Sequence, residues 1–109
     1  MTALALRTRV LGDGLELELA FDHPMESGER VDGDGIRIPP WYVTRVTLSA
    51  DDAPLAEIAL GPAVAANPVV TLALPPGLDG ATLRADWEDN RGERGSRRLG
   101  LADTTASDE

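Results

Sequence analysis

The sequence predicts an all-β domain, an antiparallel β-sandwich of about seven strands. Apolar and polar side chains alternate with a period of two in several short runs. Turn-forming Gly, Pro, Asn and Asp residues separate these runs, and no segment shows the period of a helix. The chain has 109 residues, which suits one domain. We therefore expect a single sandwich domain over residues 1–101, followed by a disordered acidic tail at 102–109.

The first two strands are expected at Ala3–Val10 and Leu15–Phe21, as an antiparallel hairpin. Gly12-Asp13-Gly14 between them is a strong turn signal. In the second run, apolar residues alternate with Glu16, Glu18 and Ala20. This alternation predicts a strand with one buried face.

The middle of the chain begins with its longest irregular region, Glu26–Pro40. A short ribbon is expected around Asp32-Gly33-Asp34-Gly35, because apolar and polar residues alternate after that turn. Tyr42–Ala50 is rich in residues that favour strands, and Leu55–Leu60 returns after a turn at Asp51-Asp52. Alternation along Tyr42–Ala50 places Tyr42, Thr44, Val46 and Leu48 together on one face of this strand.

An apolar segment rich in proline, Gly61–Pro68, separates the strand ending at Leu60 from the next strand, Val69–Leu74. Proline fixes φ and removes an amide donor, so neither strand can continue through this corner. The last two strands are expected at Thr82–Asp89 and Ser96–Leu101. Leu83, Ala85 and Trp87 of the first of these should face inward.

Composition excludes several classes of function. The formal net charge is -9, from 19 acidic and 10 basic residues. This balance argues against nucleic acids and anionic membranes as partners, because both require a basic surface. The chain has no cysteine, which excludes disulfides, thiolate metal sites and thiol nucleophiles. We expect no cofactor and no metal.

The side chains that could perform chemistry are few. His23 is the only histidine, and we favour a structural or interface role for it over a catalytic one, because no partner base or pocket is evident. Glu29, Asp32 and Asp34 could suggest calcium, but their spacing favours a solvated turn. Asp86 and Glu88 share the outer face of a strand, where a glycosidase cleft is not expected. The residues thus indicate a protein that binds rather than an enzyme.

Four segments together resemble the SoxZ family of the bacterial sulfur-oxidising system. His23-Pro24-Met25-Glu26-Ser27-Gly28 resembles a His-Pro-Met-Glu-Thr/Ser-Gly segment of that family. Ile38-Pro39 followed by Tyr42-Val43 resembles its next segment. Gly61–Pro68 resembles its Gly-Pro-Ala-Val-Ser-x-Asn-Pro corner, and Trp87–Glu93 resembles its Trp-x-Asp-Asn-x-Gly turn. The sequence departs from the family pattern at Ala65, where Ser is frequent, and at Trp41.

This resemblance implies an immunoglobulin-like fold and a non-catalytic role. SoxZ proteins pair as a heterodimer with SoxY, which carries sulfur intermediates of thiosulfate oxidation on a cysteine in its C-terminal arm, and other Sox enzymes act on that arm. The resemblance also implies a periplasmic location. Met1–Val10 lacks the apolar run of a cleavable signal, so we expect export together with SoxY.

The apolar, proline-fixed segments are expected to contribute to the partner interface. The predicted interface residues are His23, Pro24, Met25, Gly61, Pro62, Val64, Asn67 and Pro68. Alternatively, these residues only build the corner. Without its partner, the chain could form a homodimer through the same surface. Two other functions remain open: a stand-alone adhesion or accessory domain, and a small hydrolase that would need a cleft.

Overall fold

A computed structural model of the chain describes residues 2–12 and 14–101. It contains seven strands: β1 (Ala3–Leu11), β2 (Gly14–Asp22), β3 (Val43–Ala50), β4 (Ala53–Ala59), β5 (Val69–Leu74), β6 (Thr82–Asp89) and β7 (Arg94–Gly100). The predicted all-β fold is confirmed. The tail predicted at 102–109 and Asp13 of the first turn lie outside the described residues.

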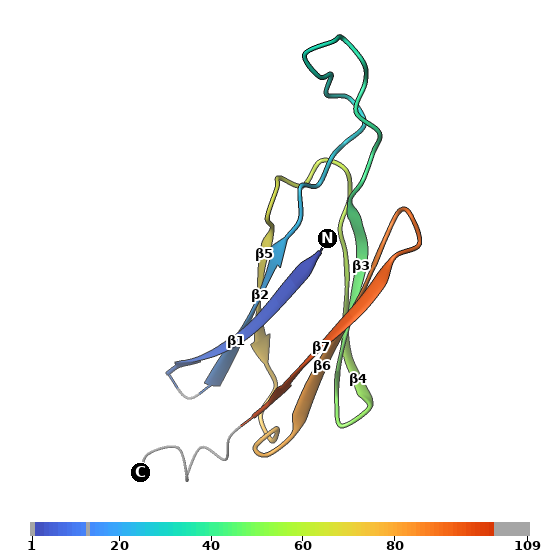
Figure 1. The fold of residues 1–109 in the computed structure, drawn as a ribbon. Coiled ribbons are helices and arrows are strands. Elements are labelled where there is room, and N and C mark those ends of the chain that lie inside the picture. Colours follow the sequence, from blue (N-terminus) through green and yellow to red (C-terminus); the bar gives the residue numbers. More distant parts are fainter. Residues whose placement is uncertain (1, 13, 102–109) are drawn as a thin grey trace.

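The strands form two antiparallel sheets that pack face to face (Figure 1). One sheet has three strands in the order β1-β2-β5, and the other has four in the order β4-β3-β6-β7. Each of the hairpins β1–β2, β3–β4 and β6–β7 stays within one sheet. Among the described residues, the chain therefore passes between the sheets at 23–42, 60–68 and 75–81.

The core lies between the two sheets, where the alternating apolar side chains point inward. Its fully buried residues come from β2, β3 and β6, with His23 beside them. The predicted inward faces of β2 and β6 are confirmed, since Leu17, Leu19, Leu83 and Ala85 are all inaccessible to solvent. Trp87 continues this face and lies over Gly95 of the neighbouring strand.

The predicted face of β3 is wrong in its first half. A register shift between Val43 and Arg45 interrupts the pairing of β3 with β6. At such a bulge two residues oppose one on the partner strand, so the alternation changes phase. Val43 therefore enters the core in place of Thr44, which is half-buried and donates its hydroxyl to the Glu88 carbonyl at 3.0 Å.

Residues 26–41 form an arm that projects beyond the sandwich (Figure 1). Its two limbs are joined by isolated antiparallel bridges at Glu26–Trp41 and Val31–Arg37, which confirms the predicted ribbon. The arm makes the molecule long and narrow, with extents of 57 × 24 × 19 Å. At one side of the sandwich β1 lies against β7, whereas the Cα atoms of β4 and β5 at the other side stay more than 8 Å apart.

Candidate functional site

The four segments that carry the motifs, far apart in the sequence, meet at the end of the sandwich from which the arm rises. We call this meeting point the junction and define it by His23, Trp41, Asn67, Asp89 and Asn90. Hydrogen bonds join His23 to Asn67 and Trp41 to Asp89 across 44 and 48 positions of sequence, and Asn90 bonds to the backbone on either side of Trp41. The junction is the candidate site because it unites all the segments that the sequence singled out.

His23 and Asn67 join the corner to the end of β2. The backbone N–H of His23 donates to Asn67 Oδ1 at 3.0 Å, and the Asn67 N–H donates to the His23 carbonyl at 2.8 Å. Asn67 has a φ of 54°, a conformation that asparagine tolerates better than most residues. The Phe21 N–H also donates to the Pro68 carbonyl at 2.9 Å. The corner thus prolongs the pairing of β2 with β5.

The His23 imidazole is packed inside the junction, with 1% of its surface exposed. Its Nδ1 accepts a hydrogen bond from the Met25 N–H at 2.9 Å. Its ring lies 4.6 Å from the Trp41 ring, centroid to centroid. Nε2 is buried and has no partner among the described residues. Burial lowers the pKa of His23, although the Asp89 and Glu93 carboxylates partly oppose the shift.

Asp89 organises the turn between β6 and β7. This carboxylate is 3% exposed, and its Oδ2 accepts a hydrogen bond from Trp41 Nε1 at 2.9 Å. Its Oδ1 accepts from the N–H groups of Arg91 and Glu93 at 2.9 and 2.8 Å. Burial alone would raise the pKa of Asp89, but these three donors outweigh it and hold the pKa below its usual value. The Asp89 carboxylate therefore serves to hold Trp41 and the turn in place.

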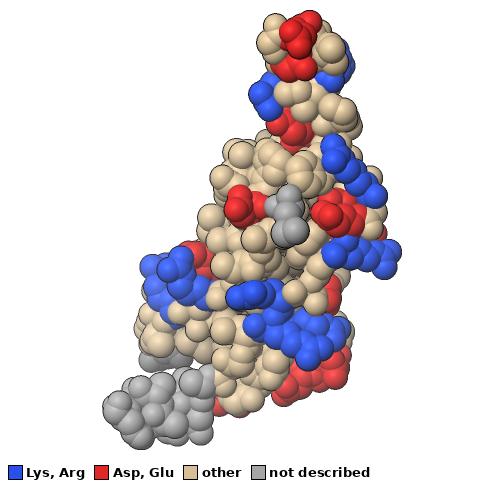
Figure 2. Space-filling view, viewed as in Figure 1, with Lys and Arg blue, Asp and Glu red and all other residues tan. Residues whose placement is uncertain are grey.

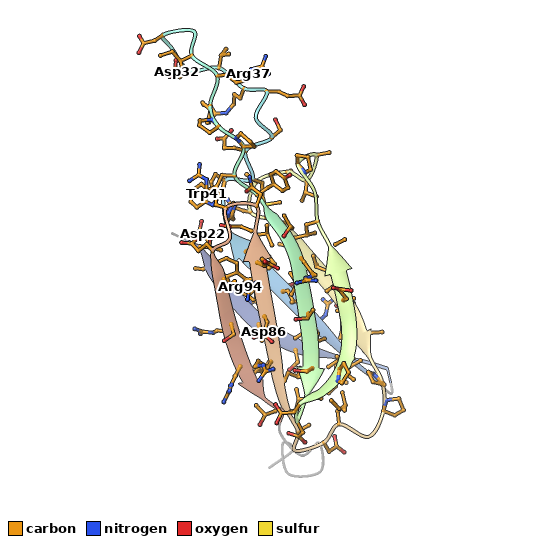
Figure 3. The ribbon with its side chains drawn as sticks, turned by 90° about the vertical axis from the view of Figure 1, so that its right-hand side faces the viewer. Asp22, Asp32, Arg37, Trp41, Asp86 and Arg94 are labelled. Carbon is orange, nitrogen blue, oxygen red and sulfur yellow. The ribbon has the colours of Figure 1, made fainter. Side chains whose placement is uncertain are left out.

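Trp41 and Asn90 fasten the arm to the same turn. The Arg91 guanidinium lies over the Trp41 ring, 4.7 Å from its centroid, a favourable cation–π arrangement. Asn90 Oδ1 accepts from the Tyr42 N–H at 2.8 Å, and its Nδ2 donates to the Pro40 carbonyl at 3.0 Å. Figure 3 shows Trp41 at the base of the arm and Asp32 and Arg37 near its far end.

The eight predicted interface residues divide into a buried and an accessible group. His23, Met25 and Pro68 are buried, Gly61 and Val64 are half-buried, and Pro24, Pro62 and Asn67 are exposed. Val64 packs against the core. The buried members thus shape the junction, and only the accessible ones can touch another protein directly. Their role in an interface remains a prediction.

The exposed part of the corner is a surface almost free of polar side chains. We call it the apolar corner, consisting of Pro24, Pro62, Ala63, Ala65 and Ala66, which are all exposed. It lies beside Asn67, whose side chain is held by His23. A small apolar surface on a hydrogen-bonded support suits contact with a protein better than a reaction.

Three of the other candidates for chemistry have structural partners. Asp86 pairs with Arg84, and Glu88 pairs with Arg45 and Arg94, on the outer face of the four-stranded sheet. Asp32 Oδ1 accepts from the N–H groups of Asp34 and Ile36 at 2.8 and 3.0 Å.

Within residues 2–12 and 14–101, no three His, Asp or Glu side chains are grouped so that they could hold a metal ion. The same residues contain no helix with the length and hydrophobicity needed to span a membrane.

Sequence reasoning did not assign Trp41, Asp89 or Asn90 to the site. All three lie within or beside the motifs, which were one signal. The alternation of β6, which continues to Asp89, was a second signal for the inward position of that residue. Trp41 bonds to Asp89, and Asn90 bonds to the backbone of Tyr42, each across 48 positions of sequence, and a pattern of alternation carries no information about such contacts.

Comparison with known families identifies a match. The model of the family described as Sulphur oxidation protein SoxZ matches residues 5–99. This range contains all four motif segments, the whole junction and most of the seven strands. A search of curated proteins finds none that matches the chain.

Proposed function

The chain belongs to the SoxZ family of sulphur oxidation proteins, and from this premise we propose that it is the non-catalytic subunit of a sulfur carrier. In this proposal it pairs with a SoxY-type subunit as a heterodimer. A cysteine of that partner bears the sulfur intermediates of thiosulfate oxidation, and the paired chain helps to present them to the other enzymes of the system.

The observation that carries the proposal is the way the family motifs are used in the structure. Their polar groups bond to one another at the junction, as the contacts of Asp89 and Asn67 show. The chain has no cysteine, so a covalently carried sulfur must reside on another protein. The apolar corner is the part of the motif segments that remains accessible, and such a surface is suited to contact with a neighbouring subunit.

We propose that the apolar corner contacts the SoxY-type subunit. Corner residues are fixed by proline and by the His23–Asn67 bonds, so little conformational entropy is lost when a partner covers them. Replacing Ala65 and Ala66 with Lys places two charges on this surface without removing a junction hydrogen bond. A charge that becomes buried and unpaired at an interface opposes association strongly.

The experiment is co-expression of the tagged chain with its SoxY-type subunit, followed by quantitative co-purification. A65K/A66K is expected to lose the partner. The matched control is T71K/A73K, which adds the same charge at exposed positions of β5, opposite Glu18 and Glu16, and should retain it. If both variants retain the SoxY-type subunit equally, the apolar corner is not part of the interface. Failure of the wild-type chain to pair would refute the proposed function itself.

The proposed location is the periplasm, reached together with the SoxY-type subunit. Support comes from the family membership, because a subunit of the carrier must be in the same compartment as the other subunit. Cell fractionation with and without the partner gene tests this. We expect the chain in the periplasmic fraction only when the partner is co-expressed, and a location independent of the partner would contradict co-export.

A further inference from the structure

The side of the sandwich on which β1 lies against β7 is basic, although the protein as a whole is acidic. The adjacent strands β1 and β7 contain five arginines and no carboxylate: Arg7, Arg9, Arg94, Arg97 and Arg98. Figure 2, which views the molecule from the same side as Figure 1, shows blue side chains spread over this region. Half of the 10 basic residues of a chain with net charge -9 therefore lie on two strands.

Three of these arginines are already neutralised within the chain. Arg7 and Arg9 pair with Glu18 and Glu16 of β2 at 2.9 and 2.7 Å, and Arg94 pairs with Glu88 of β6 at 3.3 Å. Arg97 and Arg98 are exposed and form no side-chain hydrogen bond or ion pair with any residue that the structure describes. The free positive charge of this side thus resides on β7.

The register places these two guanidinium groups on opposite faces of β7. Arg97 is opposite the buried Ala85 and so lies on the face turned toward the three-stranded sheet. Arg98 is opposite Arg84, and like charges directly across a ladder repel each other. Arg84 forms ion pairs with Asp52 and Asp86. Of the two arginines, Arg98 is therefore the one that has no carboxylate partner among the described residues.

The backbone of β7 is also unpaired on one side. β7 is the last strand of the order β4-β3-β6-β7, and β6 is the only strand in the described residues that pairs with it. β1 of the other sheet lies against β7 without pairing with it, and the outer N–H and C=O groups of β7 that β1 leaves uncovered can accept an additional strand. In Figure 3, β7 forms one margin of the sheet and β4 the other, so this edge is remote from the strand that leads into the apolar corner.

From these observations we infer that the outer edge of β7 binds an extended acidic segment of a partner protein. The segment adds to the sheet through its backbone, and carboxylates on its two faces pair with Arg97 and Arg98. Arginine suits this role because its planar guanidinium binds a carboxylate through two parallel hydrogen bonds. The alternative is that the arginines only prevent the edges of two copies from pairing.

The experiment is a titration of the ¹⁵N-labelled full chain with a short peptide of repeating Glu-Glu-Thr-Thr, followed by NMR, because successive Glu residues place carboxylates on both faces of an extended strand. Shifts of the β7 amides are expected, with binding that weakens as salt is added. The same peptide with Gln in place of Glu should bind at least several-fold more weakly. R97Q and R98Q should each raise the Kd about threefold, and the double variant about tenfold, as expected for exposed ion pairs.

The matched control is R37Q. Arg37 in the arm is also exposed and without a side-chain partner among the described residues, so R37Q removes the same charge elsewhere and should leave the Kd unchanged. An equal loss in R37Q and R98Q would show attraction by net charge alone and overturn the inference. Two results would show that the arginines only prevent the edges of two copies from pairing. One is unchanged peptide binding in R97Q/R98Q, and the other is self-association of that variant when the wild type binds no peptide.

Two further outcomes are decisive. Peptide binding that is seen only after residues 102–109 are deleted would show that the acidic end of the chain itself occupies the edge, and would overturn the partner assignment. Co-purification with the SoxY-type subunit is measured in R97Q/R98Q as well. We expect R97Q/R98Q to retain the SoxY-type subunit, because the edge of β7 and the apolar corner are separate surfaces. A failure of peptide binding can therefore be distinguished from a failure of the proposed pairing.

Discussion

Substitution of Gly95 by Ala is expected to destabilise the sandwich through one side-chain clash. Gly95 in β7 is directly opposite Trp87 in β6, and the Trp87 ring lies over its Cα. A Cβ added at Gly95 would lie 2.6 Å from Trp87 Cε2 and Cζ2 and 2.7 Å from Nε1, whereas ordinary contacts begin at 3.4 Å. The ring or the strand must therefore move by nearly 1 Å.

The cost of this displacement can be estimated. Trp87 is buried in the core cluster, so its ring cannot turn away without disturbing its neighbours. Overpacking of this kind costs about 1–3 kcal/mol. For a domain of this size, a central value of about 2 kcal/mol lowers the Tm by roughly 8–16 °C.

The assay is thermal and urea unfolding, followed by tryptophan fluorescence and circular dichroism. The control is G100A in the same strand, where an added Cβ meets no atom within 4 Å, and we expect a change within about 0.5 kcal/mol. Combining G95A with W87L should recover at least about 1 kcal/mol in a double-mutant cycle. A G95A variant as stable as the wild type would refute the described packing of Trp87 on β7.

Three further predictions concern the junction. Asp89→Asn removes the charge that three donors stabilise, and urea unfolding should show a loss of about 1.5–3 kcal/mol; no loss would exclude a structural role for the carboxylate. Asn67→Ala loses the acceptor of the His23 N–H at a positive φ and should cost about 1–2 kcal/mol, whereas Asn67→Asp, which keeps the acceptor, should cost less. His23 has a lowered pKa when folded, so below pH 6.5, its ordinary pKa, the unfolded chain binds a proton that the folded chain does not. Stability should therefore fall as the pH drops from about 6.5 toward the folded pKa, and His23→Gln should flatten this part of the pH profile; an unchanged profile would contradict the burial of His23. The lowered pKa of Asp89 acts in a separate window, below its ordinary value of 3.8, where its stabilisation is lost on protonation.

Most of the fold could be predicted because strand patterns are local. Each strand of the sandwich alternates apolar and polar side chains, and Gly, Pro and Asp mark the turns between them, so the strands were found nearly at their observed positions. The bulge at Val43–Arg45 could not be predicted, because Tyr42 and Thr44 continue the alternation on paper and only the pairing with β6 moves Val43 into the core.

The site was predictable only as a set of segments. Motif resemblance identified the residues around His23 and Asn67, but not that they bond to each other or that Trp41 and Asp89 complete the cluster. These contacts depend on how the two sheets are packed. The inward position of Asp89 could have been predicted, because burial alternates along β6 and the alternation continues to this residue. Its bond to Trp41 could not have been predicted in this way.

In the proposed pair, this chain supports a sulfur carrier and bears no sulfur itself. Native mass spectrometry of the co-expressed pair, after incubation with thiosulfate and the enzymes that act on the carrier, tests it most directly. We expect a complex with one copy of each chain and mass increments of sulfur species on the cysteine-bearing subunit alone. Sulfur bound covalently to this chain, or the absence of any complex between the two, would contradict it.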